Sequence, residues 1–326
     1  MKKYFVLFIL CFVLCGCNKQ DSIQDNSNEQ YLINKEPLSS DKDASDDICV
    51  TDTPHSVNQE ADINDGVLSD GKYSNIKVGN TIEFGCYEQD DDEIDGKEPI
   101  EWIVISLDAN EGTAMLLSKY VLDTKPFNEE KEEISWKKCS LRKWLNIDFY
   151  NEAFGEDEKT KIIEKLNDNE ENPDYGTDCG TSTKDKVFIL SLQEAINTQY
   201  GFNNSKTIID DGICYLDGNN ENSEQYFLAR TCKPTLSATM QESKLTILTQ
   251  EIYELGSSTG DPRFRESDVG NCPWWLRTMG ENALTVSFVN FNGTVHSKGV
   301  DLDVGAEGIL ASIGVGVRPV IIINIK

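Results

Sequence analysis

Two segments decide the fold: NCPWWLR, residues 271–277, and GVGVRPV, residues 314–320. Both are typical of β-strands, and we expect them to lie in one core sheet. Successive side chains of a strand point to opposite faces. One of the adjacent tryptophans Trp274 and Trp275 can therefore anchor the core while the other covers a half-exposed surface.

Arg277 and Arg318 belong to the same two segments, at positions where strands should be largely buried. A buried guanidinium group needs a carboxylate or several carbonyl groups as partners. One interpretation is a structural ion pair that fixes the register of the sheet. The alternative is that Trp275 and Arg277 line a ligand-binding groove.

The chain has 326 residues, of which 38% are hydrophobic and 27% are charged, and its formal net charge is −27. The first three values are ordinary for a globular protein, whereas the charge is not. A protein that binds the phosphate backbone of nucleic acids needs a basic surface, which this composition does not supply. The composition therefore excludes nucleic acid as a partner and favours an acidic surface protein.

Residues 1–16 are typical of a signal peptide, because two lysines precede an apolar run, residues 4–14, that is too short to span a bilayer. The sequence LCGC at residues 14–17 then resembles the lipobox of bacterial lipoproteins. This resemblance implies that Cys17 is diacylated, becomes the mature N-terminus and anchors the protein at the extracytoplasmic face of the cell membrane. The alternative is a soluble secreted protein that is cleaved nearby.

Residues 17–75 are rich in Asp, Asn, Ser, Gln and Glu and show no apolar periodicity. Such a segment cannot bury enough apolar surface to offset its chain entropy. We therefore expect a lipid-anchored, disordered acidic tether that holds the folded domain away from the membrane. Its like charges keep it extended.

Residues 76–326 are expected to form one α+β domain with a mixed, mostly antiparallel sheet and a few helices. The predicted strands cover residues 77–85, 100–105 and 113–117, which form a meander, and residues 186–190, 284–291 and 294–300. The predicted helices cover residues 141–150, 156–166 and 191–200. Ser191 and Glu194 form a capping box that opens the third helix. Asn292-Gly293 predicts a type I′ turn between the last two strands.

An acidic segment, DDDEIDG at residues 90–96, connects the first two predicted strands. Several of its residues align with the ligand positions of a calcium loop, but the closing position falls on Trp102 rather than on a glutamate. An acidic hairpin loop is the better interpretation. If a calcium ion is bound elsewhere, Asp301 and Asp303 are the candidate ligands, because the alternation of a strand puts both on one face. A solvated face without an ion is the favoured interpretation there, and no other cofactor is expected.

Eight short motifs follow one another in a fixed order. They are GNTIEFG at 79–85, EPIEW at 98–102, LSKY at 117–120, LRKWL at 141–145, FYN at 149–151, DKVF at 185–188, WWLR at 274–277 and GVRP at 316–319. Together they resemble an uncharacterised bacterial family, domain of unknown function 6273, over residues 76–326. This family occurs in surface proteins of anaerobic Gram-positive bacteria and has no assigned activity. The resemblance therefore implies a location but no chemistry.

The closing Gly316-Val317-Arg318 strand also resembles the last strand of C-type-lectin-like domains, especially those related to sulfatase-modifying factors. This second resemblance implies a lectin-like fold, and a fold alone does not imply a function. The formylglycine-generating relatives use a closely spaced cysteine pair to bind copper and oxidise a substrate thiol. Cys214, Cys232 and Cys272 show no such spacing.

The composition also restricts catalytic chemistry. With only two histidines, His55 and His296, a multi-histidine metal site is excluded, and a Ser-His-Asp triad could use only His296. We expect His296 to be a surface residue of a hairpin strand. Beyond the signal peptide and the acylated Cys17, the cysteines are Cys49, Cys86, Cys139, Cys179, Cys214, Cys232 and Cys272. This odd number argues against a complete disulfide framework.

These observations favour a lipid-anchored binding module without catalysis, whose ligand is a glycan, a cell-wall component or another surface protein. One alternative is an enzyme related to the formylglycine-generating oxidases, and another is a display scaffold with variable loops. An exposed aromatic patch beside Trp275 would favour binding over a scaffold. Two thiols that meet at the surface of the domain would favour the enzyme.

Overall fold

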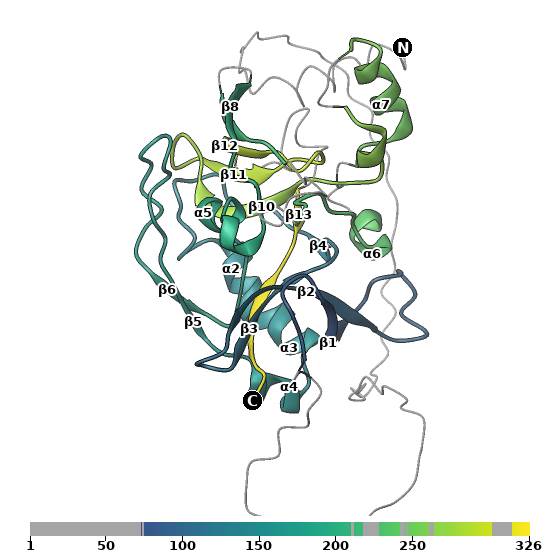
Figure 1. Ribbon diagram of the computed structural model, residues 1–326, viewed down its shortest axis with the longest axis vertical. Coiled ribbons are helices and arrows are strands. Elements are labelled where there is room, and N and C mark those ends of the chain that lie inside the picture. The colour runs from purple at the N-terminus through teal and green to yellow at the C-terminus, as the bar shows by residue number, and fades with distance from the viewer. Residues whose placement is uncertain are drawn as a thin grey trace, which may run out of the picture.

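The computed structural model describes residues 73, 75–209, 212–217, 228–241, 245, 247–260, 264–301 and 315–326 (Figure 1). The predicted signal peptide, Cys17, nearly all of the predicted tether and Asp303 lie outside the described residues. Within the described part of the chain, no helix combines the length and the hydropathy that crossing a membrane requires.

The first sheet has five strands, and all its neighbouring strands pair antiparallel. Their order across the sheet is β1 (Thr81–Tyr87), β2 (Glu98–Asp108), β3 (Thr113–Ser118), β14 (Val320–Asn324) and β7 (Val187–Phe188). Strands β1 to β3 confirm the predicted meander. The C-terminal strand β14 lies inside this sheet, between β3 and β7.

The second sheet has seven strands, and it contains both of the segments that decide the fold. Their order is β4 (Asp123–Thr124), β13 (Gly316–Val317), β10 (Trp274–Met279), β11 (Thr285–Val289), β12 (Val295–Asp301), β9 (Gly212–Tyr215) and β8 (Lys206–Ile209). Trp274 pairs with Gly316 in parallel, so the expectation that the two segments share a sheet is confirmed for Gly316-Val317 but not for Val320, which begins β14. The apolar run that follows Arg318 forms β14 and belongs to the other sheet.

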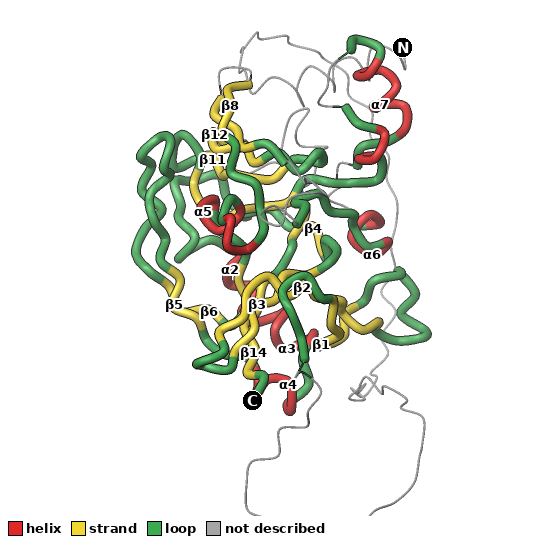
Figure 2. Tube along the Cα trace, in the orientation of Figure 1, coloured by secondary structure: helices red, strands yellow, loops and turns green. Residues whose placement is uncertain are grey.

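The helices are short and lie around the two sheets (Figure 2). They are α2 (Ser140–Trp144), the π-helix η1 (Leu145–Phe149), α3 (Tyr150–Ala153), α4 (Glu156–Lys161), α5 (Leu192–Ala195), η2 (Thr198–Tyr200), α6 (Leu236–Met240), α7 (Gln250–Ser257) and η3 (Glu266–Asp268). The predicted helix over residues 141–150 is confirmed as the continuous run α2–η1–α3. The capping box of α5 is also confirmed: the Glu194 amide donates to Ser191 Oγ, and the Ser191 amide donates to the Glu194 carboxylate.

The predicted helix over residues 156–166 is wrong at its C-terminal end. Helix α4 ends at Lys161, and the chain continues into β5 (Lys165–Asn167), which pairs with β6 (Thr183–Asp185) in a two-stranded ribbon. Leu166, expected on the apolar face of a helix, is exposed. The inner face of the ribbon is polar instead, because Asp185 is buried and accepts hydrogen bonds from Asn167, Thr183, Trp136 and Arg142. Four donors offset the cost of removing this carboxylate from water.

The turn between β11 and β12 differs from the predicted type I′ turn. A type I′ turn needs positive φ angles at both central residues, but of Asn292 and Gly293 only Gly293 has one, at 77°. The connection instead spans residues 290–294 and is closed by the Asn290 amide, which donates to the Thr294 carbonyl. The hairpin itself is confirmed.

Arg318 lies where the chain crosses from the second sheet to the first. Its side chain is buried, its Nε donates to the Ser118 carbonyl at 2.8 Å, and its guanidinium lies 5.1 Å from the centre of the Trp274 ring. Its Nη1 also donates to the Arg230 carbonyl. The expectation that carbonyl groups satisfy this guanidinium is confirmed. Together the two sheets and short helices confirm the α+β class.

Gly85 lies where β1 packs closely against Ala153 and Phe154. Its φ is 72°, and a Cβ atom there would lie 2.6 Å from both the Ala153 carbonyl oxygen and the Phe154 ring. Gly96, with a φ of 98° and no atom near its missing Cβ, shares only the backbone strain. We expect Gly96→Ala to lower the free energy of unfolding by about 1–2 kcal/mol. Gly85→Ala should cost roughly 1–3 kcal/mol more, because it adds a steric clash.

Chemical denaturation of the two variants of the full chain measures the difference. Equal losses for Gly85→Ala and Gly96→Ala would show that the contact between Gly85 and the segment around Phe154 is looser than described.

Candidate functional site

The structure places both Trp275 and Arg277 inside the core rather than on a surface. Trp275 is buried; its Nε1 donates to the Lys125 carbonyl at 2.9 Å, and its ring lies edge-on to Phe127. The expectation that one of the two tryptophans covers a half-exposed surface is wrong, since Trp274 is buried as well. In this arrangement Trp275 serves to pack the segment around Phe127 on β10.

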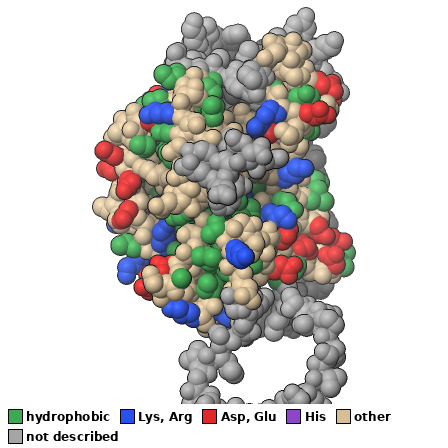
Figure 3. Space-filling view, in the orientation of Figure 1, with side chains coloured by type: hydrophobic (Ala, Val, Ile, Leu, Met, Phe, Trp, Pro, Cys, Tyr) green, Lys and Arg blue, Asp and Glu red, His purple; other side chains and the backbone are tan. Residues whose placement is uncertain are grey.

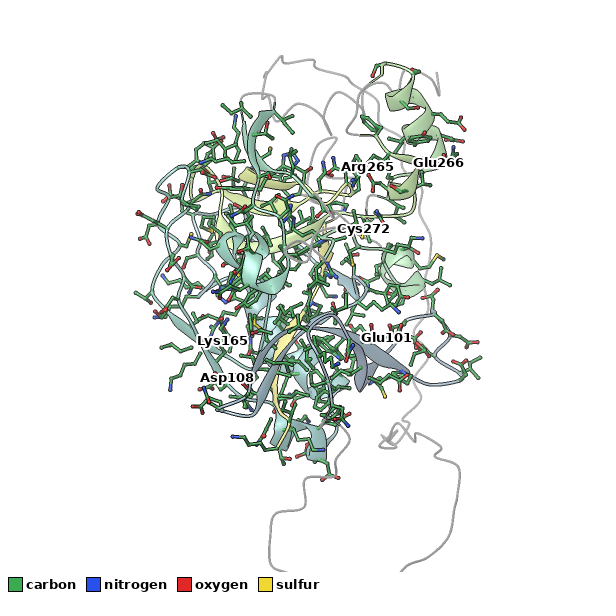
Figure 4. All side chains as sticks on the ribbon, viewed as in Figure 1. Glu101, Asp108, Lys165, Arg265, Glu266 and Cys272 are labelled. Atoms are coloured by element: carbon green, nitrogen blue, oxygen red, sulfur yellow. The ribbon has the colours of Figure 1, made fainter. Side chains whose placement is uncertain are left out.

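Arg277 takes part in a buried ion pair, as one of its two interpretations predicted. Its Nη1 donates to the Ile189 carbonyl and to the carboxylate of Glu194 on α5. Lys165, which projects from β5 (Figure 4), donates to the same carboxylate at 2.6 Å. Burial raises the pKa of Glu194, but the charges of Arg277 and Lys165 outweigh it and lower the pKa from 4.5 to about 2. The cluster therefore ties α5 and β5 to the end of β10.

The lowered pKa of Glu194 predicts a loss of stability in acid. In the unfolded chain this carboxyl titrates near 4.5, so its contribution is complete above that pH and is lost as the pH falls towards 2. The contribution is roughly 3 kcal/mol. We expect Glu194→Gln to be less stable at neutral pH and to show a shallower decline of unfolding free energy between pH 4.5 and 2.

Glu156→Gln provides the control, because the Glu156 side chain is 90% exposed and its pairing with Lys159 contributes little. Urea denaturation at a series of pH values measures both variants. An acid decline in Glu194→Gln as steep as that of the unaltered chain would contradict the assignment.

The remaining predicted site residues are only partly described. Asp301 ends β12, where it pairs with Thr285, but its side chain and the whole of Asp303 lie outside the described residues. The predicted calcium site at these two aspartates therefore stays a prediction, as does the acylation of Cys17.

Five cysteines, namely Cys139, Cys179, Cys214, Cys232 and Cys272, are not disulfide-bonded, and all five are buried. Cys86 is disulfide-bonded. Cys232 and Cys272 approach each other, since the Cys272 amide donates to the Cys232 carbonyl at 2.9 Å. They meet in the core, where Cys272 lies two residues before β10 (Figure 4). Burial, and next the charge of Cys232, raise the pKa of the Cys272 thiol.

The connection between β1 and β2 carries the strongest concentration of charge. Residues 88–98 contain seven carboxylates and one lysine, and Figure 3 shows acidic side chains gathered over this hairpin. The lysine, Lys97, pairs with Glu152 outside the segment. The predicted acidic hairpin loop is confirmed, with Asp90 and Asp92 stabilising its turns by accepting backbone hydrogen bonds. At its tip, Ile94 is 95% exposed.

At the base of this hairpin, Glu88, Asp90 and Glu98 bring carboxylate oxygens within 4.8 Å of one another. Burial raises the pKa of Glu98. None of these three residues aligns with a ligand position of a calcium loop, although all three lie in residues 88–98. Exposed acidic groups often gather without an ion, so the cluster by itself does not define a metal site.

Helix α6 lies beside the hairpin and adds apolar side chains to it. The Ser237 amide donates to the Gln89 carbonyl at 3.1 Å, which joins the first turn of α6 to the hairpin base. Leu236 is 54% exposed and Met240, one helical turn later, is 63% exposed. We call residues 88–98 together with Leu236 and Met240 the hairpin–α6 surface.

Helix α6 was not predicted from the sequence, because residues 201–270 are rich in polar side chains. A local signal was present: Thr235 precedes the helix as its N-cap and accepts a hydrogen bond from the Ala238 amide.

Comparison with known proteins adds one relationship. A model of the family described as Domain of unknown function (DUF6273) matches residues 111–325. The match begins in the turn between β2 and β3, later than the expected residue 76, so it includes α6 but not the acidic hairpin. No curated protein and no solved structure matches the chain.

Proposed function

Because the chain belongs to the DUF6273 family, whose description carries no activity, we propose a function from the chain's own surface. The protein is a lipid-anchored, extracytoplasmic binding module without catalysis. Its hairpin–α6 surface binds a basic segment, with apolar side chains, of another cell-surface protein.

One observation carries this proposal: large apolar side chains and unneutralised carboxylates share the hairpin–α6 surface. Ile94, Leu236 and Met240 are three of the seven exposed large hydrophobic residues in the described part of the chain. Burying apolar area against a partner contributes about 25 cal/mol per Å². The carboxylates of residues 88–98 attract a positively charged partner and speed its association.

The negative charge of the hairpin also determines which partners this surface can bind. A second copy of the chain would bring an equally acidic hairpin and a net charge of −27 against it. Nucleic acids and anionic lipid headgroups are repelled for the same reason. A basic protein segment neutralises the hairpin while its apolar side chains cover Leu236, Met240 and Ile94.

The position of Cys232 and Cys272 does not favour the oxidase alternative, because these two thiols meet in the core rather than at the surface. The lipobox-like LCGC at residues 14–17 and the acidic tether would display the domain at a distance from the membrane. The lectin-like assignment of the fold, based on the closing Gly316-Val317-Arg318 strand, belongs to the same proposal.

The anchor is tested by exchanging one cysteine. We expect Cys17→Ser to move the protein from the membrane fraction to the medium or a soluble extracytoplasmic fraction, because the diacylated side chain is removed. Cys15→Ser is the matched control, since Cys15 lies in the same segment but is removed with the signal peptide. Membrane retention of Cys17→Ser would contradict acylation at this residue.

The binding surface is tested with the full chain carrying Cys17→Ser and a synthetic amphipathic helix of Lys and Leu as the probe. Replacing three hairpin acids, Asp91→Asn, Asp92→Asn and Glu93→Gln, should weaken binding about tenfold at low salt. The control removes the same charge elsewhere, through Glu129→Gln, Glu130→Gln and Glu132→Gln, all at exposed positions. It should leave the affinity within about twofold.

The apolar part of the surface has its own pair of variants. Leu236→Ser with Met240→Ser should weaken binding of the Lys/Leu helix, while Ile208→Ser, at a 74% exposed position on β8, should not. A Lys/Ser peptide without apolar side chains should bind more weakly than the Lys/Leu helix.

Equal losses of affinity in the two acidic triple variants would show that binding depends only on net charge and would falsify the proposed surface. Binding to a glycan array instead would move the function to the carbohydrate alternative.

A further inference from the structure

Four paired residues form a row across the open half of the seven-stranded sheet. Phe288 on β11 pairs with His296 on β12, His296 pairs with Cys214 on β9, and Cys214 pairs with Thr207 on β8. Directly paired residues of antiparallel strands project from the same face of a sheet. The register therefore fixes an imidazole between an aromatic ring and a thiol.

The imidazole and the thiol are within hydrogen-bonding reach. Cys214 Sγ lies 3.5 Å from His296 Nδ1, and the imidazole ring stacks on the Phe288 ring with centroids 4.9 Å apart and planes 14° from parallel. Stacking on Phe288 restricts the plane of the imidazole, and Nδ1 is the ring nitrogen that lies towards the thiol. A nucleophile, a neighbouring base and a group that orients the base are the parts of an activated cysteine.

The other four described thiols have different hydrogen-bond partners. Cys139 and Cys232 donate to backbone carbonyl oxygens, which cannot accept a proton from the thiol. Among the five described thiols, Cys214 is the one that faces an imidazole, and His296 is the one histidine of the described residues.

We infer that Cys214 and His296 form a thiol–imidazole nucleophile whose co-reactant is a small, low-molecular-weight disulfide. His296 Nδ1 takes the thiol proton, and the Cys214 thiolate attacks one sulfur of the disulfide. A new S–S bond forms to Cys214 while the original S–S bond breaks. The departing thiolate takes the proton from the imidazolium and leaves as a thiol. The disulfide is the oxidant, so Cys214 becomes a mixed disulfide without any further redox partner.

A reagent can reach Cys214 only when the edge of the sheet opens, because this side chain is buried. The Cys214 side chain is 1% exposed, whereas His296, Phe288 and Thr207 are each half-buried. Strand β8 is the last in the sheet and pairs only with β9 among the described strands. Local opening of such an edge hairpin costs less than global unfolding, although it also breaks the hydrogen bonds that tie β9 to Asp174 and Tyr175. Opening of β8–β9 therefore admits a small reagent to Cys214 before the thiols of the core.

The test uses the full chain carrying Cys17→Ser, treated with bis(2-hydroxyethyl) disulfide at neutral pH. Peptide mapping by mass spectrometry follows each thiol separately. We expect Cys214 to be modified at least about tenfold faster than Cys139, Cys179, Cys232 and Cys272. His296→Ala should slow modification of Cys214 by at least about tenfold and leave the other four rates unchanged.

The direction of the His296→Ala effect separates a base from a packing residue. If His296 only packs β12 on β9, its removal loosens the edge and speeds modification of Cys214. If it is the base, the rate falls even though the edge is looser. Thr207→Val, at the other end of the row, is the control that should leave the rate within about twofold. The inference is overturned if Cys214 reacts no faster than the other four thiols, or if His296→Ala raises its rate. The hairpin–α6 surface lies elsewhere, so neither outcome affects the proposed binding function.

Discussion

The guanidinium of Arg318 joins the two sheets of this domain. It donates to the Ser118 carbonyl at the end of β3, in the first sheet, and lies over Trp274 of β10, in the second. A buried cation is costly unless hydrogen bonds and an aromatic face replace its water. Arg230, whose guanidinium donates to five carbonyl groups, meets the same requirement nearby. Arg277 meets it in part: its Nη1 pairs with Glu194, whereas its Nε has no hydrogen-bond partner among the described residues. Although the chain is strongly acidic, three of its arginines are buried in the core.

Features that depend on neighbouring residues could be predicted from the sequence. The capping box of Ser191 and Glu194, the meander β1–β3 and the helical run from Ser140 follow from local pattern. Errors arose where distant segments decide the outcome. The apolar run of β14 matches any core strand, and only its pairing with β3 and β7 assigns it to the first sheet. Leu166 fits a helix, yet the buried Asp185 draws its neighbours into a ribbon with a polar inner face.

For the candidate sites too, local patterns could be predicted from the sequence and long-range contacts could not. The acidic hairpin was evident because its charges are consecutive in the chain. From the sequence, Trp275 was a candidate to face a ligand. Alternation along a strand does not reveal that the segment around Phe127 packs over this side chain. His296 looked like an ordinary surface histidine, since the thiol it meets lies 82 positions away in the sequence. Groups brought together by sheet register can be found only once the register is known.

The C-terminal residues occupy interior positions in both sheets: β13 lies between β4 and β10, and β14 between β3 and β7. Neither sheet is complete until residues 315–326 are present. A chain that lacks them has two unclosed sheets with unpaired strand edges, so the domain cannot complete its fold without these residues.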